Sequence, residues 1–286
     1  MVRRPLGNHH HGHDTLLVTS DPVTSDPVTS DTEQKTAPVS ERDERREQCE
    51  HERSEDLRNL VLGARVVLWD FDGPLCRLFA GHSAARVAGE LVDWLETQGL
   101  AEPLTQEERA RPDPHVLLGA VSRRHHRGDL VAEFEERLTR EELRAVPTAW
   151  PTPYADPLIR TWSALGVGLA VTTNNSPRAV SEYLATRGLL DCFAPHLYGR
   201  TRNPHLLKPD PYTLDRALGA MGVAPAQALM VGDSASDLAA AERAGVPFLG
   251  YGHNERKTKI LKDAGARTVV HSLKPVLRLL WERRYR

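Results

Sequence analysis

The chain has 286 residues, a formal net charge of −2 and 40 % hydrophobic residues. This length allows one sizeable core with a small second domain or a tail, and the balanced charge argues against a nucleic-acid partner. Three widely spaced cysteines, Cys49, Cys76 and Cys192, form no disulfide framework or metal knuckle, which favours a reduced cytoplasm. No apolar run approaches the roughly 18 residues of a membrane span, so we expect a soluble cytoplasmic protein without a membrane partner.

Residues 1–58 differ in composition from the rest of the chain. Residues 18–31 repeat a five-residue unit that contains proline and little apolar surface, which predicts disorder. Residues 40–59 are dense in charges of both signs and are typical of a solvated helix. We therefore expect residues 1–58 to form a charged, disordered tail. Its histidines gain little geometric selectivity as metal ligands and are interpreted as solvated. They are His9, His10, His11 and His13.

The first strong element is VVLWD, residues 66–70, which has the pattern of a buried strand. Helical patterns follow over residues 82–100, 113–126 and 129–146, with few strand signals between them. These patterns predict a helical segment over residues 77–150.

Strand and helix patterns alternate after a proline-rich turn at residues 147–157. The predicted strands are VGLAVTTNN, ALMVGDS and VPFLGYG, and the helical patterns between them include PRAVSEYLATRG and SDLAAAERAG. This alternation predicts an α/β fold with a doubly wound parallel sheet, built from residues 59–76 and 151–286. Ligands of such sheets bind beyond the carboxyl ends of the strands.

Polar side chains follow the predicted strands at the points where they end. They are Asp70, Asp72, Thr172, Thr173, Asn174, Asp233 and Asp237, with Lys208 between the second and third strands. If the strands are parallel neighbours, these groups collect at one edge of the sheet. The close pair Asp70 and Asp72 would repel each other, so it requires a cation, a proton-transfer role, or both. Carboxylates with a hydroxyl and an ammonium suit Mg²⁺ and a phosphate group.

Four ordered motifs over about residues 60–255 resemble the haloacid dehalogenase superfamily of phosphohydrolases. The motifs are DFDGPL (70–75), VTTNN (171–175), LKPDP (207–211) and VGDSASD (231–237). The resemblance implies a Rossmann-like core and, for the helical segment at 77–150, a small cap that closes over the site and determines specificity. Among the members, the chain resembles the phosphoglycolate phosphatases.

The resemblance also implies catalytic and metal-binding residues. Asp70 would attack phosphorus and form an aspartyl-phosphate. Asp72 would protonate the leaving oxygen and then activate water. Mg²⁺ would be held by the Asp70 carboxylate, the Asp72 backbone carbonyl and Asp233, with Asp237 in support.

The substrate phosphate would be bound by Thr173, Asn174 and Lys208. These groups would orient and neutralise the transferring phosphoryl group. Thr172 competes with Thr173 for this role, because strand register decides which hydroxyl faces the site.

The predicted function is that of a Mg²⁺-dependent phosphatase acting on a small phosphorylated metabolite. Asp72 argues against carbon–halogen cleavage, because family members with that activity lack this second acid. A phosphomutase like β-phosphoglucomutase shares every motif and remains an alternative. A non-catalytic regulatory protein is a second alternative, against which the intact set of motif residues counts.

The predicted cap contains few readable signals. RRHHRG, residues 123–128, is either a basic loop that meets the substrate or a solvated connection between helices, and we favour the connection. Arg77 and His82 follow the first strand closely and could face the pocket.

Overall fold

The computed structural model describes residues 39–100, 104–124 and 128–284. The chain divides into two units, Met1–Glu44 and Arg45–Arg286. The first unit is described only where helix α1, Val39–Gly63, begins. The predicted disorder of residues 1–38 and the histidine cluster lie outside the described residues. The charged segment over 40–59 is helical, as its pattern indicated, and α1 continues past the tail boundary predicted at residue 58.

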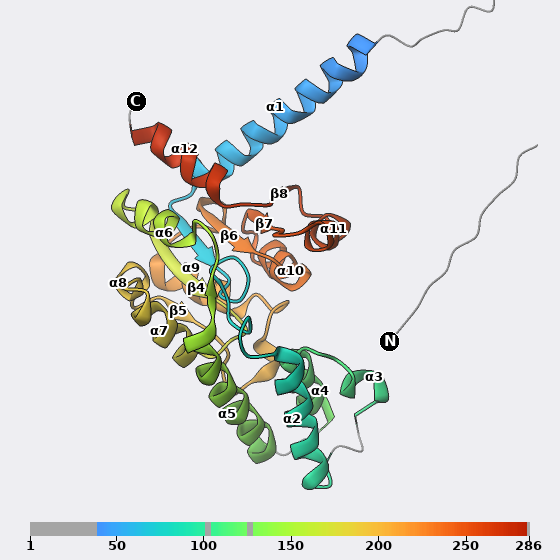
Figure 1. The fold of residues 1–286 in the computed structure, drawn as a ribbon. Coiled ribbons are helices and arrows are strands. Elements are labelled where there is room, and N and C mark those ends of the chain that lie inside the picture. Colours follow the sequence, from blue (N-terminus) through green and yellow to red (C-terminus); the bar gives the residue numbers. More distant parts are fainter. Residues whose placement is uncertain (1–38, 101–103, 125–127, 285–286) are drawn as a thin grey trace, which may run out of the picture. The chain divides into compact units, whose positions relative to one another are not determined.

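A six-stranded sheet forms the centre of the second unit (Figure 1). The strand order is β5-β4-β1-β6-β7-β8, and each neighbouring pair is parallel. The strands are β1 Val66–Trp69, β4 Gly168–Thr172, β5 Leu197–Tyr198, β6 Ala228–Gly232, β7 Phe248–Tyr251 and β8 Thr268–Val270. Together with the helices around it, this sheet confirms the predicted α/β fold.

Helices cover both faces of the sheet because side chains alternate along each strand. Val67 and Trp69 of β1 pack with helices α6, α7 and α12, whereas Val66 and Leu68 pack with α9 and α10. The helices of this part are α6 Ala155–Ala164, α7 Pro177–Thr186, α8 Leu190–Phe193, α9 Tyr212–Met221, α10 Ala235–Ala244, α11 Glu255–Asp263 and α12 Lys274–Arg284. Short 3-10 turns span Val146–Thr148, Pro204–Leu206 and Pro225–Gln227.

The chain order places a ligand crevice at the middle of the sheet. From β1 the chain continues to β4 on one side, and from β6 it continues to β7 on the other. Such a reversal between neighbouring strands opens a crevice at their carboxyl ends. The residues that follow β1 and β6 therefore meet at this crevice.

A helical segment separates β1 from β4. It lies between two short antiparallel strands, β2 Cys76–Arg77 and β3 Trp150–Pro151. Its helices are α2 Ala84–Thr97, α3 Gln106–Arg109, α4 Pro114–Arg124 and α5 Gly128–Ala145. Helices α2, α4 and α5 share a hydrophobic cluster that includes Leu91, Leu117 and Phe134. Figure 1 shows the four helices of this segment. The predicted helices at 82–100, 113–126 and 129–146 correspond to α2, α4 and α5, and their role as a cap stays a prediction.

No helix in the described residues combines the length and the apolar character that a membrane crossing requires.

Candidate active site

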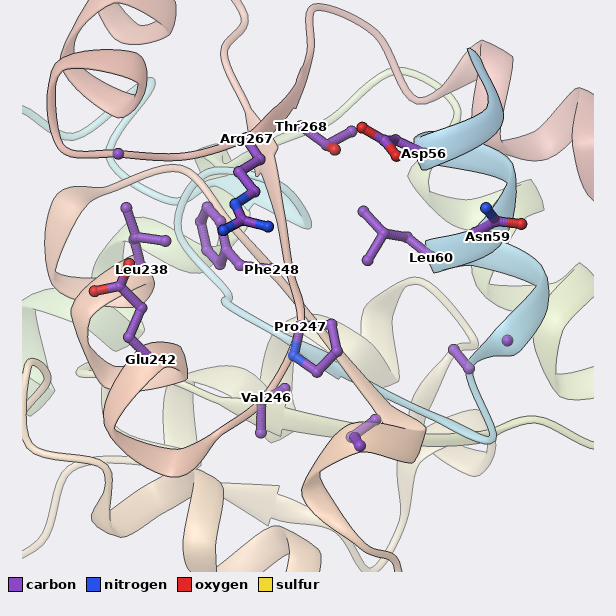
Figure 2. A pocket seen from close by; sticks show the side chains of 15 residues that line it. Asp56, Asn59, Leu60, Leu238, Glu242, Val246, Pro247, Phe248, Arg267 and Thr268 are labelled. Carbon is purple, nitrogen blue, oxygen red and sulfur yellow. The ribbon is translucent and has the colours of Figure 1, made fainter. Parts of the chain in front are cut away.

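Two cavities of similar size lie at opposite edges of the sheet. One, of about 490 Å³, lies near the first residues of β6, β7 and β8, where Arg267 points into it beside Phe248 (Figure 2). The other, of about 500 Å³, lies beyond the carboxyl ends of the strands and is lined by Asp70, Asp72 and Asp233. Among the described residues, the acids of the first cavity belong to no cluster able to hold a metal ion. The second cavity is therefore the candidate active site.

Asp70 and Asp72 occupy the loop after β1. The Asp70 amide donates a hydrogen bond to the carbonyl of Val231 (2.9 Å), which fixes the start of this loop against β6. The Asp72 carboxylate accepts a hydrogen bond from the Leu78 amide (2.8 Å). Gly73 has a φ of 151°, and a Cβ there would lie 2.3 Å from the Asp233 carboxyl carbon. The close approach of this loop to Asp233 therefore requires glycine.

Lys208 stands at the centre of the acids. Its ammonium donates to Asp70 Oδ1 (2.7 Å), to the Thr172 carbonyl (2.9 Å) and to Asp237 Oδ1. The side chain is only 1 % exposed. Burial alone would lower the pKa of Lys208, but the Asp237 and Asp70 carboxylates outweigh it and raise that pKa. Lys208 is therefore a fixed positive charge beside Asp70.

Asn174 holds the Lys208 loop in place. Its side-chain oxygen accepts from the Lys208 amide (2.7 Å), and its side-chain nitrogen donates to the Lys208 carbonyl (3.2 Å). Asn174 also lines the cavity. These two hydrogen bonds join the loop after β4 to the lysine motif.

Asp70, Asp233 and Asp237 form a buried acidic cluster. They offer carboxylate oxygens that lie within 4.8 Å of one another. The Oδ2 atom of Asp237 accepts from the amides of Asp233 (3.1 Å) and Ser234 (3.1 Å), in the capping box that begins α10. Hard divalent cations such as Mg²⁺ prefer oxygen ligands of this kind. The donor set therefore fits a divalent cation, with Asp237 largely engaged in holding the loop.

Burial raises the pKa values of three acids in this site. Asp70, Asp72 and Asp233 each reach about 6, mainly because burial disfavours the charged carboxylate. Lys208 partly offsets this effect at Asp70, and the Leu78 amide does so at Asp72. A carboxyl group with a pKa near 6 can exchange a proton close to neutral pH. A bound cation would again favour the charged forms.

The register of β4 separates the two threonines. The Thr172 hydroxyl donates to the sulfur of Met230 (3.4 Å) inside the sheet core. The Thr173 hydroxyl donates to Asn175 Oδ1 (3.1 Å), and Thr173 lines the cavity. Thr173 is thus placed toward the acids, whereas Thr172 contributes only its carbonyl, to Lys208. The predicted catalytic, phosphate-binding and metal-binding residues all line this cavity; they are Asp70, Asp72, Thr173, Asn174, Lys208, Asp233 and Asp237.

The chain matches a known family of enzymes. Residues 64–245 match the family model described as haloacid dehalogenase-like hydrolase. The chain belongs to the haloacid dehalogenase-like hydrolases. A protein named phosphoglycolate phosphatase from Thiobacillus denitrificans is 32 % identical over 235 residues, which cover 76 % of this chain and 96 % of that protein. Another of that name, from Mannheimia succiniciproducens, is 28 % identical over 208 residues, covering 69 % of this chain and 81 % of the relative. These relatives confirm the prediction of a phosphatase.

Solved structures share the fold. A haloacid dehalogenase-like family protein from Streptococcus pneumoniae has a TM-score of 0.54 and 16 % identity, covering 77 % of this chain and 99 % of that chain. CbbY from Rhodobacter sphaeroides, solved in complex with phosphate, has a TM-score of 0.54 and 22 % identity, covering 73 % of this chain and 94 % of that chain. At these identities the likeness concerns the fold.

Glu142 of α5 is the centre of a buried network that the sequence did not reveal. It is fully buried and binds Arg200 through both carboxylate oxygens, at 2.7 and 3.0 Å. It also accepts from the side chain of Asn175 (3.0 Å) and the amide of Ser176 (2.9 Å). Although burial alone would raise the pKa of Glu142, Arg200 and other donors lower it to about 2. A helix of the inserted segment thus fixes the loop that carries Thr173.

His115 of α4 joins this network to the cavity. Its Nε2 lies 3.1 Å from Glu142 Oε1, and its Nδ1 lies 3.6 Å from Asp113 Oδ1. Burial alone would lower the pKa of His115, but the two carboxylates raise it to about 9. Asp113 and His115 both line the cavity. No motif marked them, because they lie in a helical segment whose pattern reveals only its apolar face.

Other candidates from the sequence lie elsewhere. The Arg77 guanidinium stacks over Trp150 at 5.5 Å, and His82 binds Glu141 (2.9 Å). Neither residue lines the cavity, so the suggestion that they face it is not supported. In RRHHRG, Arg123 and Arg124 are the last residues of α4 and pair with Glu108 (3.7 and 2.7 Å). Residues 125–127 lie outside the described part.

Proposed function

We propose that this protein is a Mg²⁺-dependent phosphatase that hydrolyses a small phosphorylated metabolite through an aspartyl-phosphate at Asp70. The observation that carries the proposal is the setting of the Asp70 carboxylate. It lies 2.7 Å from the Lys208 ammonium and belongs to the acidic cluster with Asp233. A nucleophile, a positive charge for phosphate and a metal-binding group therefore meet at one point, as phosphoryl transfer requires.

The chain's own groups divide the chemistry between them. Asp70 supplies the attacking oxygen, while the positive charge of Lys208 stabilises the phosphoryl oxygens and Thr173 orients them. Asn174 acts through the hydrogen bonds that hold the Lys208 loop. Asp72, with its pKa raised to about 6, protonates the leaving oxygen and later accepts a proton from water. The Leu78 amide holds the Asp72 carboxylate in position for both steps.

The residues that would hold Mg²⁺ are the Asp70 carboxylate, the Asp72 backbone carbonyl and Asp233. Asp237 supports them, because its oxygens are engaged by Lys208 and by the amides that begin α10. When bound, Mg²⁺ supplies positive charge that stabilises the phosphoryl oxygens. Lys208 and Lys257 offset only part of the negative charge of the acids in this site, and a bound cation would offset more of it, which supports this assignment.

The helical segment at 77–150 is proposed to act as the cap over this site. Asp113, His115 and Val116 of this segment line the cavity together with the core acids. A cap that closes here would exclude water and contact the leaving part of the substrate. A cavity of about 500 Å³ suits a small metabolite. Because the relatives are named phosphoglycolate phosphatase, phosphoglycolate is the first substrate to test.

The test is phosphate release from a panel of phosphorylated metabolites with Mg²⁺, comparing the wild type with Asp70→Asn. We expect release by the wild type and a loss of about 1,000-fold or more in the variant. Asp263→Asn, at an exposed pair with Lys259, is the matched control and should keep wild-type activity. Equal release by the wild type and Asp70→Asn would refute Asp70 as the nucleophile. Release that depends on a sugar bisphosphate activator would instead favour the phosphomutase.

A further inference from the structure

Three cationic side chains border the catalytic cavity among the described residues. They are Lys208, His115 and Lys257. A substrate that carries a second anionic group, beside its phosphate, needs a cation with a free hydrogen-bond donor. The contacts of the three side chains differ in this respect.

Lys208 and His115 have no donor to spare. Lys208 is 1 % exposed, and its three N–H groups are matched by three acceptors. Both ring nitrogens of His115 face carboxylates, those of Glu142 and Asp113. The charge of His115 thus neutralises Asp113, which would otherwise repel an anionic substrate from this part of the cavity.

Lys257 is different. It lies in the first turn of α11, where its amide donates to the capping residue Asn254 (2.8 Å), so its backbone is fixed. Its side chain is 35 % exposed, and its ammonium donates to Asp233 Oδ2 (2.8 Å). The second contact, to the Asp233 carbonyl, is long at 3.5 Å. Because an ammonium has three N–H donors, at least one remains for a ligand in the cavity.

The position of Lys257 relative to Asp72 indicates which part of a substrate it meets. Both residues line the cavity, and the positive charge of Lys257 offsets a small part of the rise that burial causes in the pKa of Asp72. Asp72 is the proposed acid for the leaving oxygen. Because Asp72 and Lys257 line the same cavity, a leaving group that Asp72 protonates lies in the cavity that the Lys257 ammonium borders. The second oxygen of Asp233 stays available for a cation while Oδ2 binds Lys257.

We propose that Lys257 is a specificity-determining residue whose ammonium binds a carboxylate in the leaving part of the substrate. The preferred substrates are then small phosphate monoesters with a carboxylate close to the ester oxygen, and neutral esters of the same shape are poorer. This inference rests on the proposed phosphatase function and assigns the preference for a carboxylate to one residue of that site, Lys257.

The experiment compares phosphoglycolate with its neutral amide, in which a carboxamide replaces the carboxylate. The kcat/KM values for both are measured on the wild type, Lys257→Met and Lys257→Arg. A charge-assisted hydrogen bond is worth about 10-fold to 100-fold in binding. We expect a higher kcat/KM of the wild type for phosphoglycolate than for the amide. Lys257→Met should lower the ratio of these two kcat/KM values by about that factor, mainly through KM. Lys257→Arg should restore much of the ratio. Lys259→Met, on the same helix but 77 % exposed, should keep the wild-type ratio.

Three outcomes would overturn the inference. Equal losses on both substrates in Lys257→Met would mean that Lys257 acts only through Asp233, and calorimetric Mg²⁺ titration of the variant would then show an altered metal affinity. Equal kcat/KM values of the wild type for both substrates would remove the carboxylate preference while the proposed function stands. A wild type that hydrolyses no phosphate ester would refute the proposed function itself, and the inference would fall with it.

Discussion

Replacement of Glu142 by glutamine tests whether the buried network fixes the inserted segment to the core. The variant keeps the size of the side chain and removes its charge. Glu142 and Arg200 both have fully buried side chains, and the two are joined by two hydrogen bonds. Breaking a buried ion pair from one side costs about 3–5 kcal/mol, because the remaining charge stays buried without its partner. Glu135, at 3.0 Å, still faces Arg200, so we expect the lower end, about 3 kcal/mol.

The assay is urea unfolding of wild type and variant, with the midpoint and slope compared. Glu136→Gln is the matched control, because Glu136 lies on the same helix and binds Arg178 at the surface, where the side chains are 40 % and 60 % exposed. Exposed pairs contribute about 0–1 kcal/mol, so the control should unfold almost as the wild type does. A free energy of unfolding for Glu142→Gln within about 1 kcal/mol of the control would refute the reasoning.

Three further predictions concern pH, the glycine loop and strand register. The pKa of His115 is raised to about 9, so its contribution to stability is complete below pH 6.5 and is lost as the pH rises through 9. Measured by urea unfolding, the free energy of unfolding of the wild type should fall by at most roughly 3 kcal/mol as the pH rises over this range, and that of His115→Gln should fall markedly less. Equal falls in the two proteins would contradict this. Gly73→Ala would place a Cβ 2.3 Å from the Asp233 carboxyl carbon and should weaken calorimetric Mg²⁺ binding roughly 10-fold or more; unchanged affinity would show that the loop relaxes. Thr173→Val should lower kcat/KM far more than Thr172→Val, whose hydroxyl contacts only Met230; equal losses would refute the register argument.

The sequence predicted the core of the site because parallel strands bring their carboxyl ends to one edge. Asp70, Thr173 and Asp233 each follow a strand directly, so their sequence positions were enough to bring them together. Lys208 lies beyond the turn Pro204–Leu206, and its hydrogen bonds with Asn174 place it at the same edge. The register of β4 was not decided by pattern alone, since Thr172 and Thr173 are adjacent. The packing of Met230 against Thr172 resolves it.

The residues that sequence reasoning missed are fixed by tertiary contacts. Glu142 and Arg200 are 58 positions apart, and nothing in the local pattern of α5 marks Glu142 as buried. Lys257 reaches Asp233 only because α11 begins beside the end of β6, a placement that depends on the turn after β7. Strands β5 and β8 have two and three residues, too few for a period-two pattern to show.

The central claim is that Asp70 carries the phosphoryl group during turnover. The most direct test is to let the enzyme turn over phosphoglycolate in the presence of Mg²⁺ and to quench the reaction with acid. The acyl phosphate is then reduced with borohydride, which converts a phosphorylated aspartate to homoserine. Asp72→Asn should slow hydrolysis of the intermediate and so raise its yield, because the proposed base is lost. The account predicts homoserine at position 70 in the peptide mass spectrum. An unmodified Asp70 during steady turnover, or homoserine at the position of another aspartate, would contradict it.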